Sequence, residues 1–218
     1  MLSQEFFDLF KGLERAHGRY DLSTENQDGQ KQGGTARTVQ ETITLHEWDL
    51  HLKGERGLGV IPIRDDNKVY WGAIDIDVYD LDLEEFSKSL GSSPIIPCRT
   101  KSGGLHLYVF FKESILAKSV VPKLREIATL LGHASAEIFP KQIKIISERG
   151  DVGNWINMPY FGGEYSTRYA FYNGKRLSLE EFISTAKDKR LNNVNEIKIP
   201  NFKKENSDGI ITATGKKW

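Results

Sequence analysis

The order of six segments between residues 70 and 139 constrains the fold of this chain more than any other feature. Strand-like segments are rich in β-branched and aromatic residues, and helix-like segments repeat apolar residues every three or four positions. Gly91 and Gly132 follow the two helix-like segments, as expected at helix ends. The sequence predicts strands at 70–77, 95–100, 105–111 and 136–139 and helices at 83–90 and 117–131. This β-α-β-β-α-β order is typical of an α+β fold of the ferredoxin-like, or RRM-like, kind.

Such a topology brings polar residues from distant segments together. Its strand order is 4-1-3-2, so the first strand lies between the third and the fourth and runs antiparallel to both. Asp75 and Asp77 lie two positions apart at the end of the first strand and therefore share a face. His106 begins the third strand and Glu137 begins the fourth. We expect these four side chains to meet at one edge of an exposed sheet face.

Each of these residues also has a simpler interpretation. An Asp-Ile-Asp segment can lie on a solvated edge, and a lone histidine or glutamate in a strand usually has a structural or surface role. However, the acidic strand is expected to be central, where two like charges on one face repel each other. A bound divalent cation would offset that repulsion. The convergence of all four residues therefore favours the functional interpretation.

The donor set indicates which metal would bind. Asp75, Asp77 and Glu137 offer hard carboxylate oxygens, which suit Mg²⁺ or Mn²⁺ better than zinc. The single cysteine, Cys98, excludes a disulfide framework or a cysteine-based zinc site within one chain. Two such ions would activate an attacking hydroxyl and stabilise a leaving pyrophosphate.

The turn between the second and third core strands is a candidate phosphate site. Backbone N–H groups of Ser102, Gly103 and Gly104 can surround phosphate oxygens, and the Ser102 hydroxyl and His106 can add hydrogen bonds. A glycine pair alone is a weak indication, because most such pairs are hairpin turns. The flanking Arg99 and Lys101, with His106, strengthen it. Lys141, Lys144 and Arg149 form a second basic cluster just after Glu137, which also suits a triphosphate.

Segments outside the core complete the expected organisation. They are a helix at 3–16, a long polar loop at 21–38, a helix at 45–53 capped by Thr44 and Glu47, strands at 57–63, near 155–158 and at 168–172, and a helix capped by Ser178 and Glu181 that ends near Lys189. We expect one catalytic domain over residues 1–189, with the RRM-like core at 70–139, and a linker or tail over 190–218.

Composition limits the setting and the partners. Thirty basic residues balance thirty acidic ones, which argues against a uniformly basic surface but permits a local basic groove. No apolar run approaches the roughly 18 residues that cross a bilayer, and the N-terminus lacks the basic start and apolar centre of a secretory signal. These features, with the single cysteine, predict a reduced, cytoplasmic setting without membrane partners.

Three motifs resemble those of the archaeo-eukaryotic primase superfamily. They are Ile74-Asp75-Ile76-Asp77, Ser102-Gly103-Gly104-Leu105-His106 and Glu137-Ile138-Phe139-Pro140. They correspond to an acidic pair at a strand end, a serine–histidine motif in the next hairpin and a third acidic residue on a later strand. The chain is most similar to the primase-polymerase domains of phages and of conflict systems. Segments 57–63, 139–142 and 153–160 add to the likeness, which covers roughly residues 30–185.

The resemblance implies an RRM-like catalytic unit packed against an N-terminal α/β unit, with the active site in the cleft between them. It implies a DNA primase-polymerase of phage or conflict-system type, acting in DNA replication inside a bacterial or phage-infected cell. Such an enzyme transfers nucleotides from dNTP or NTP to a 3′-hydroxyl on a single-stranded DNA template with a primer. By position, Asp75, Asp77 and Glu137 would hold the metals, Ser102 and His106 would hold the triphosphate, and Lys101 would assist.

The sequence departs from the primase pattern in one respect and permits other functions. The usual cysteine-rich zinc element of primases is absent, so primer initiation stays in doubt whereas extension is expected. A helicase following the C-terminus is a further expected partner. The alternative function is a non-catalytic RRM-like module that binds single strands through Tyr108 and Phe110, which share the His106 face. A nuclease or replication initiator is disfavoured because the sequence has no His-x-His motif.

Overall fold

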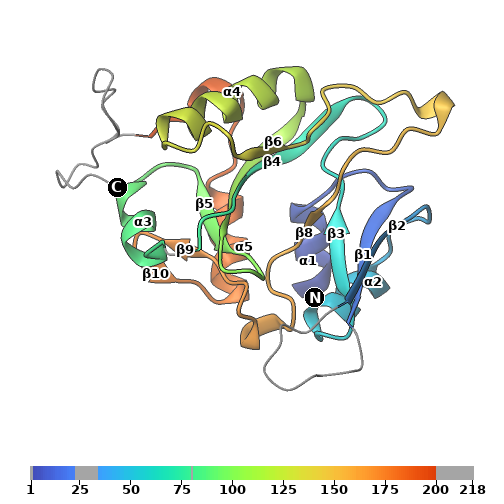
Figure 1. The fold of residues 1–218 in the computed structure, drawn as a ribbon, viewed down its shortest axis with the longest axis horizontal. Helices are drawn as coiled ribbons and strands as arrows, with labels where there is room; N and C mark the ends of the chain where they lie inside the picture. Colours follow the sequence, from blue (N-terminus) through green and yellow to red (C-terminus); the bar gives the residue numbers. More distant parts are fainter. Residues whose placement is uncertain (1, 23–33, 80, 200–218) are drawn as a thin grey trace.

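The computed structural model describes residues 2–22, 34–79 and 81–199, and Figure 1 shows their arrangement. The core sheet has the strand order β5-β6-β4-β7, which is 4-1-3-2 when the core strands are numbered along the chain. The predicted RRM-like topology is therefore confirmed. The core elements are β4 (Lys68–Ile76), α3 (Leu83–Ser89), β5 (Ile96–Arg99), β6 (Leu105–Leu116), α4 (Ala117–Leu130) and β7 (Glu137–Phe139).

Local capping signals fix where three helices begin. Asp82 accepts a hydrogen bond from the Glu85 backbone N–H at the start of α3 (3.0 Å). Complete capping boxes begin α2 (Leu45–Leu52) and α5 (Leu179–Asp188), where the cap side chains of Thr44 and Ser178 accept a first-turn N–H. Each box satisfies backbone donors that a helix start leaves without a partner. The sequence signals for these three helices are thus confirmed.

A second sheet lies beside the core in Figure 1 and forms most of the N-terminal unit. Its strand order is β2-β1-β3-β8, so a strand from late in the chain completes a sheet that the N-terminus begins. The elements of this unit are α1 (Leu2–Leu9), β1 (His17–Leu22), β2 (Gly34–Val39), α2, β3 (Gly57–Val60) and β8 (Ile156–Asn157).

Two predictions for the N-terminal unit were wrong in extent. The segment 21–38, expected to be a loop, begins and ends in the paired strands β1 and β2, and residues 23–33 lie outside the described residues. Backbone pairing needs no apolar side chains, so the polarity of these strands concealed them. The helix expected at 3–16 ends at Leu9, and the chain then passes close to another segment: a Cβ at Gly12 would lie 2.1 Å from the Ile61 carbonyl oxygen.

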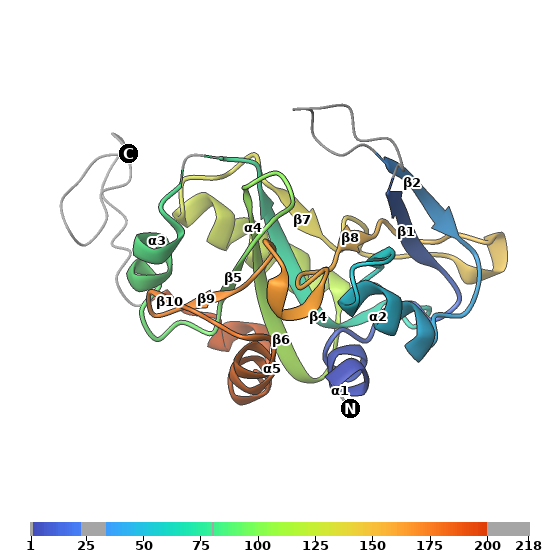
Figure 2. The same cartoon turned by 90° about the horizontal axis from the view of Figure 1, so that it is seen from below.

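The expected exposed face of the core sheet is buried, which corrects the sequence interpretation. Tyr108 and Phe110 are 0% and 1% exposed and pack among aromatic rings. The Phe10 and Tyr108 ring centroids lie 5.3 Å apart, and those of Phe110 and Phe182 lie 6.2 Å apart. Figure 2 shows α1 and α5 on the same side of the sheet. Phe10 directly follows α1, and Phe182 lies on α5. The aromatic surface proposed for the binding-only alternative is therefore unavailable.

The chain after β8 returns to the core. The expected strand at 168–172 is confined to β9 (Phe171–Tyr172), which forms a hairpin with β10 (Lys175–Arg176). Beyond α5, Leu191 and Ile197 are buried and the Lys112 N–H donates to the Leu191 carbonyl at 2.9 Å. The packed chain thus continues past residue 189, and residues 200–218 lie outside the described residues. No helix in the described part of the chain is long and apolar enough to cross a membrane.

Candidate active site

Strand register places Asp75 at the centre of the site. On β4, Asp75 is paired directly with His106 of β6 on one side and with Glu137 of β7 on the other. The His106 Nε2 and Asp75 Oδ1 atoms lie 3.4 Å apart. Because directly opposed residues of an antiparallel pair share a face, all three side chains leave the same side of the sheet. The predicted convergence of the three strands is present in the backbone.

A buried hydroxyl orients His106. Tyr108 lies two residues further along β6, on the same face, and its Oη atom lies 3.0 Å from His106 Nδ1. Burial raises the pKa of Tyr108 well above its ordinary value, so the hydroxyl keeps its proton. The hydroxyl contacts His106 Nδ1 on one side and the Asn157 carbonyl oxygen, 3.3 Å away, on the other. Nε2 of His106 is then the ring nitrogen that faces Asp75.

A cleft of about 140 Å³ lies where the core meets the segment that follows β8. It contains six of the residues expected at the site, two acidic and four that are basic or polar. It is lined by Asp75, Asp77, Arg99, Thr100, Lys101, Ser102, His106, Asn157, Met158, Pro159 and Arg168. The core therefore supplies one wall, and Asn157 of β8 with the segment that follows it supplies the other.

The turn that follows β5 is held in a defined shape. The Thr100 N–H donates to the Gly104 carbonyl (2.9 Å), and the Gly103 N–H donates to the Thr100 carbonyl (3.2 Å). Gly103 has a φ of 98°, which favours glycine, and a Cβ at Gly104 would lie 2.5 Å from the Ile76 carbonyl oxygen. The turn therefore packs against the end of β4 and brings Ser102 beside the acidic pair.

Two cations near this turn already have partners. Arg99 Nη1 donates to the Thr167 carbonyl oxygen at 3.2 Å. Lys101 Nζ lies 4.0 Å from the centroid of the Tyr20 ring and hydrogen-bonds to its hydroxyl. Tyr20 belongs to β1, so the Lys101 contact joins the core to the N-terminal sheet across the cleft.

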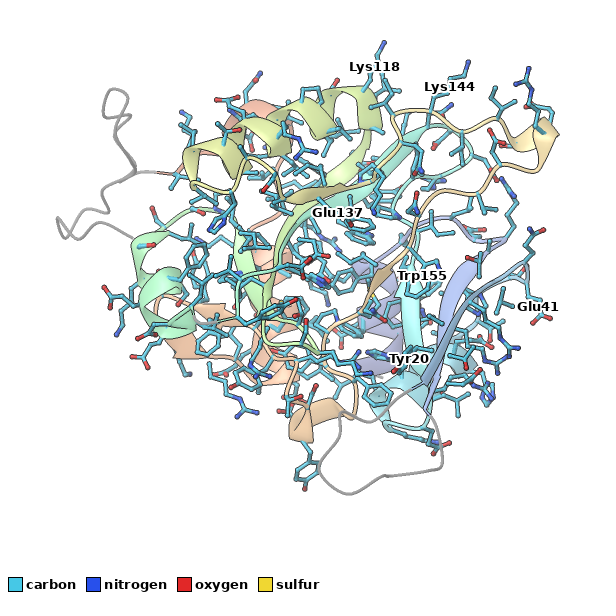
Figure 3. The ribbon with its side chains drawn as sticks, viewed as in Figure 1. Tyr20, Glu41, Lys118, Glu137, Lys144 and Trp155 are labelled. Atoms are coloured by element: carbon cyan, nitrogen blue, oxygen red, sulfur yellow. The ribbon has the colours of Figure 1, made fainter. Side chains whose placement is uncertain are left out.

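Glu137 and Lys141 lie outside the cleft and pair with each other. Their Oε2 and Nζ atoms are 2.6 Å apart, and the Glu137 side chain is 54% exposed. The described residues contain no group of three or more His, Cys, Asp or Glu arranged to hold a metal ion. The structure thus brings Asp75 and Asp77 into one cleft, whereas the carboxylate of Glu137 is directed to Lys141. Figure 3 labels Glu137 near the centre of the molecule and Lys144 at its margin.

Arg168, which the sequence pattern does not indicate, is a buried cation in the cleft. It is only 6% exposed, its Nη1 has no hydrogen-bond partner, and its guanidinium carbon lies 4.9 Å from the Phe161 ring centroid. Burial lowers its pKa, but a guanidinium stays charged in proteins. A lone arginine at the start of an expected strand gives no signal, because such residues are usually solvated.

A neutral histidine supports the opposite wall. His51 is fully buried; its Nε2–H donates to the Pro159 carbonyl (2.8 Å), and its Nδ1 accepts the Leu58 N–H (3.1 Å). Burial lowers the pKa of His51 to about 4. Since both ring nitrogens hold backbone groups, His51 joins α2 and β3 to the segment that lines the cleft.

This pKa predicts a specific sensitivity to acid. The unfolded chain binds the His51 proton near pH 6.5 and the folded chain only near 4. The free energy of unfolding should therefore fall as the pH drops from about 6.5 to 4, by up to about 3 kcal/mol. Urea unfolding of the protein and of His51→Gln across this range measures the effect. The variant should lack this part of the pH dependence, and parallel curves for the two proteins would contradict the assignment.

Comparison with known proteins identifies the family. A search of curated proteins gives no match. Among solved structures, the AEP domain of the cyanophage S-2L primase-polymerase is similar with a TM-score of 0.46 and 13% identity, over 85% of this chain and 96% of that one. Residues 17–201 match the family described as "TOTE conflict system, Archaeo-Eukaryotic Primase domain". Its superfamily consists of primase- and polymerase-type nucleotidyltransferases. Because the match spans most of the sequence, the chain belongs to the archaeo-eukaryotic primase domain family of TOTE conflict systems.

Proposed function

We propose that this protein is a DNA primase-polymerase. It transfers nucleotides from nucleoside triphosphates to a 3′-hydroxyl under the direction of a single-stranded template and releases pyrophosphate. One observation carries the proposal: Asp75 is paired with His106 and Glu137 in register and shares a cleft with Asp77 and several cations. Separate acidic and basic groups around one small volume suit a metal–triphosphate substrate.

The carboxylates fit a divalent cation by their chemistry. Asp75 and Asp77 both line the cleft and offer hard oxygen donors, which Mg²⁺ and Mn²⁺ prefer. Glu137 would complete the set if it exchanged its partner Lys141 for the cation. That ion pair is partly exposed and contributes little to stability, so the exchange costs little. Two bound ions would activate the attacking hydroxyl and neutralise the leaving pyrophosphate.

The basic wall would bind the triphosphate. Ser102 and His106, which line the cleft, would donate hydrogen bonds, and Lys101 and Arg99 would provide charge beside the turn. Arg168 would add a buried guanidinium from the lining of the same cleft, and its Nη1 has no hydrogen-bond partner. A fixed, desolvated donor binds phosphate more strongly than a mobile surface lysine does. We assign Gly103, Gly104 and, after its release from Glu137, Lys141 to the same nucleotide site.

Primer extension tests the proposal directly. The protein is incubated with a primed DNA template, labelled dNTPs and Mg²⁺ or Mn²⁺, and products are resolved by length. Template-dependent extension that stops when the metal is chelated is expected. Absence of extension with every dNTP, NTP and metal combination would overturn the assignment. Unprimed templates in the same assay determine whether the chain initiates, and parallel dNTP and NTP reactions determine the sugar preference.

A further inference from the structure

Glycine recurs on one face of the N-terminal sheet. Strand register places Gly18 opposite Gly59, and Tyr20 opposite Gly57, so these residues share a face. On the flanking strands, Gly34 of β2 and Asn157 of β8 continue the same face. Glycine in a strand weakens it unless another group must approach the backbone closely. The repetition at adjacent registers therefore indicates a close approach.

Two aromatic rings occupy these positions. A Cβ added to Gly18 would lie 2.1 Å from Trp155 Cδ2, and one added to Gly59 would lie 2.3 Å from Trp155 Cε3. A Cβ added to Gly34 would lie 2.5 Å from Tyr20 Cζ. Both rings therefore rest on bare backbone. Trp155 Nε1 also donates to Thr38 Oγ1 at 3.2 Å, which fixes the indole in its plane.

The rings adjoin the cleft on its N-terminal side. Trp155 lies two residues before Asn157, which lines the cleft, and Tyr20 contacts Lys101, which lines it from the core. Both rings are partly exposed rather than buried. In the view of Figure 3, Trp155 is drawn between Glu137 and Tyr20, over the strands of the N-terminal sheet. The two rings thus form a surface that begins where the nucleotide site ends.

We propose that Tyr20 and Trp155 form a stacking platform for bases of the single-stranded template as it leaves the cleft. This inference rests on the proposed function and adds the location of one of its partners. Flat aromatic faces bind any base, as a template site requires, because every base has a π-face. The glycine face keeps the rings close to the sheet, and Lys101 supplies positive charge at the end next to the cleft.

Packing alone is the competing explanation, since aromatic rings commonly cover strand glycines. It accounts for the contacts between the rings and the glycines but gives no reason why both rings stay partly exposed. The two explanations differ in what the rings do when a strand is added. Only the platform requires that DNA contact the indole.

Tryptophan fluorescence gives the first test. Trp48 and Trp71 are fully buried, so a Trp218→Phe background leaves Trp155 as the reporter that solvent and DNA can reach. Titration with a single-stranded DNA oligonucleotide, without metal or dNTP, should quench the emission of this background protein. The same titration of the background carrying Trp155→Phe should give no such quenching. Saturating DNA that leaves Trp155 emission unchanged would overturn the proposal.

Binding measurements give the second test. Loss of one stacking ring costs about 5- to 150-fold in affinity for single strands. In fluorescence anisotropy with a labelled oligonucleotide, Trp155→Leu and Tyr20→Leu should each weaken binding within this range, whereas Trp155→Phe should retain most of it. Gly59→Ala keeps the indole but puts a Cβ where the ring packs, so it should displace the ring and also weaken binding. Equal affinity in all four variants would establish that the rings only pack.

The outcome is separable from that of the proposed function. If Trp155→Leu loses oligonucleotide affinity and the unaltered protein fails to extend primers, the platform stands and the polymerase assignment fails. If extension proceeds and both the affinity and the extension of Trp155→Leu equal those of the unaltered protein, the platform fails alone. Binding of dNTP with Mn²⁺, measured by calorimetry, should be unchanged in Trp155→Leu and reports whether the cleft is intact.

Discussion

Asp75→Asn is expected to abolish nucleotide incorporation, by roughly a thousandfold or more in kcat/KM. The side chain keeps its shape but loses the charge that lies 3.4 Å from His106 Nε2 and lines the cleft. If Asp75 holds a catalytic cation, its loss removes the electrostatic stabilisation of the leaving pyrophosphate, which is usually the largest single contribution to such a rate. Primer extension under single-turnover conditions measures the change.

The fold should tolerate this substitution. Asp75 and Asp77 share a face, so removing one negative charge relieves repulsion in the absence of metal. Thermal unfolding without metal is therefore expected to change little, while added Mn²⁺ should stabilise the unaltered protein more than the variant. Asp188→Asn, an exposed carboxylate on α5 far from the cleft residues in sequence, is the matched control and should keep full activity. Undiminished extension by Asp75→Asn would refute the assignment of the site.

Arg168→Met is expected to weaken dNTP binding by about 10- to 100-fold while making the protein more stable. Hydrogen bonds to charged groups contribute about 1.5–3 kcal/mol each, and Arg168 lines the cleft with a guanidinium whose Nη1 has no hydrogen-bond partner. Without ligand, the same guanidinium is a buried charge with an unsatisfied donor, which costs stability. Methionine retains much of the volume of the arginine side chain. It removes both the destabilising buried charge and the contact with phosphate.

Opposite changes in binding and stability identify this role. Calorimetry with dNTP and Mn²⁺ reports affinity, and urea unfolding of the free protein reports stability. Arg168→Lys keeps the charge without the planar fork and should recover part of the affinity. If Arg168→Met instead unfolds more easily and binds dNTP normally, Arg168 acts only by packing on Phe161.

The acidic motif and its meeting with His106 could be predicted from the sequence because both depend on local pattern and one topology. Helix caps such as Ser178 with Glu181 form their hydrogen bonds within four residues, so a short stretch of sequence is enough to recognise them. A β-α-β-β-α-β order then leaves few ways to pair the strands. Once Asp75, His106 and Glu137 were assigned to strand ends, the 4-1-3-2 order determined that they would be neighbours.

Other features depend on partners that the local pattern does not reveal. β6 is apolar on both faces, which is typical of a strand buried on both sides, but α1 and α5, which cover its second face, come from opposite ends of the described chain. The burial of Tyr108 follows from that packing. Similarly, β8 pairs with β3, which lies about a hundred residues earlier in the sequence. Only this pairing brings the Trp155 ring onto Gly18 and Gly59.

By itself, the sequence determined which groups the protein carries and which strand ends hold them, because periodicity and capping are short-range properties of the chain. Only the tertiary structure decided which of those groups face a common volume. It directed Asp75, Asp77 and His106 into the cleft, paired Glu137 with Lys141 outside it, and buried Arg168 in its wall. Desolvation and side-chain direction arise from contacts between segments distant in sequence, so they are set when the core and the N-terminal unit pack together.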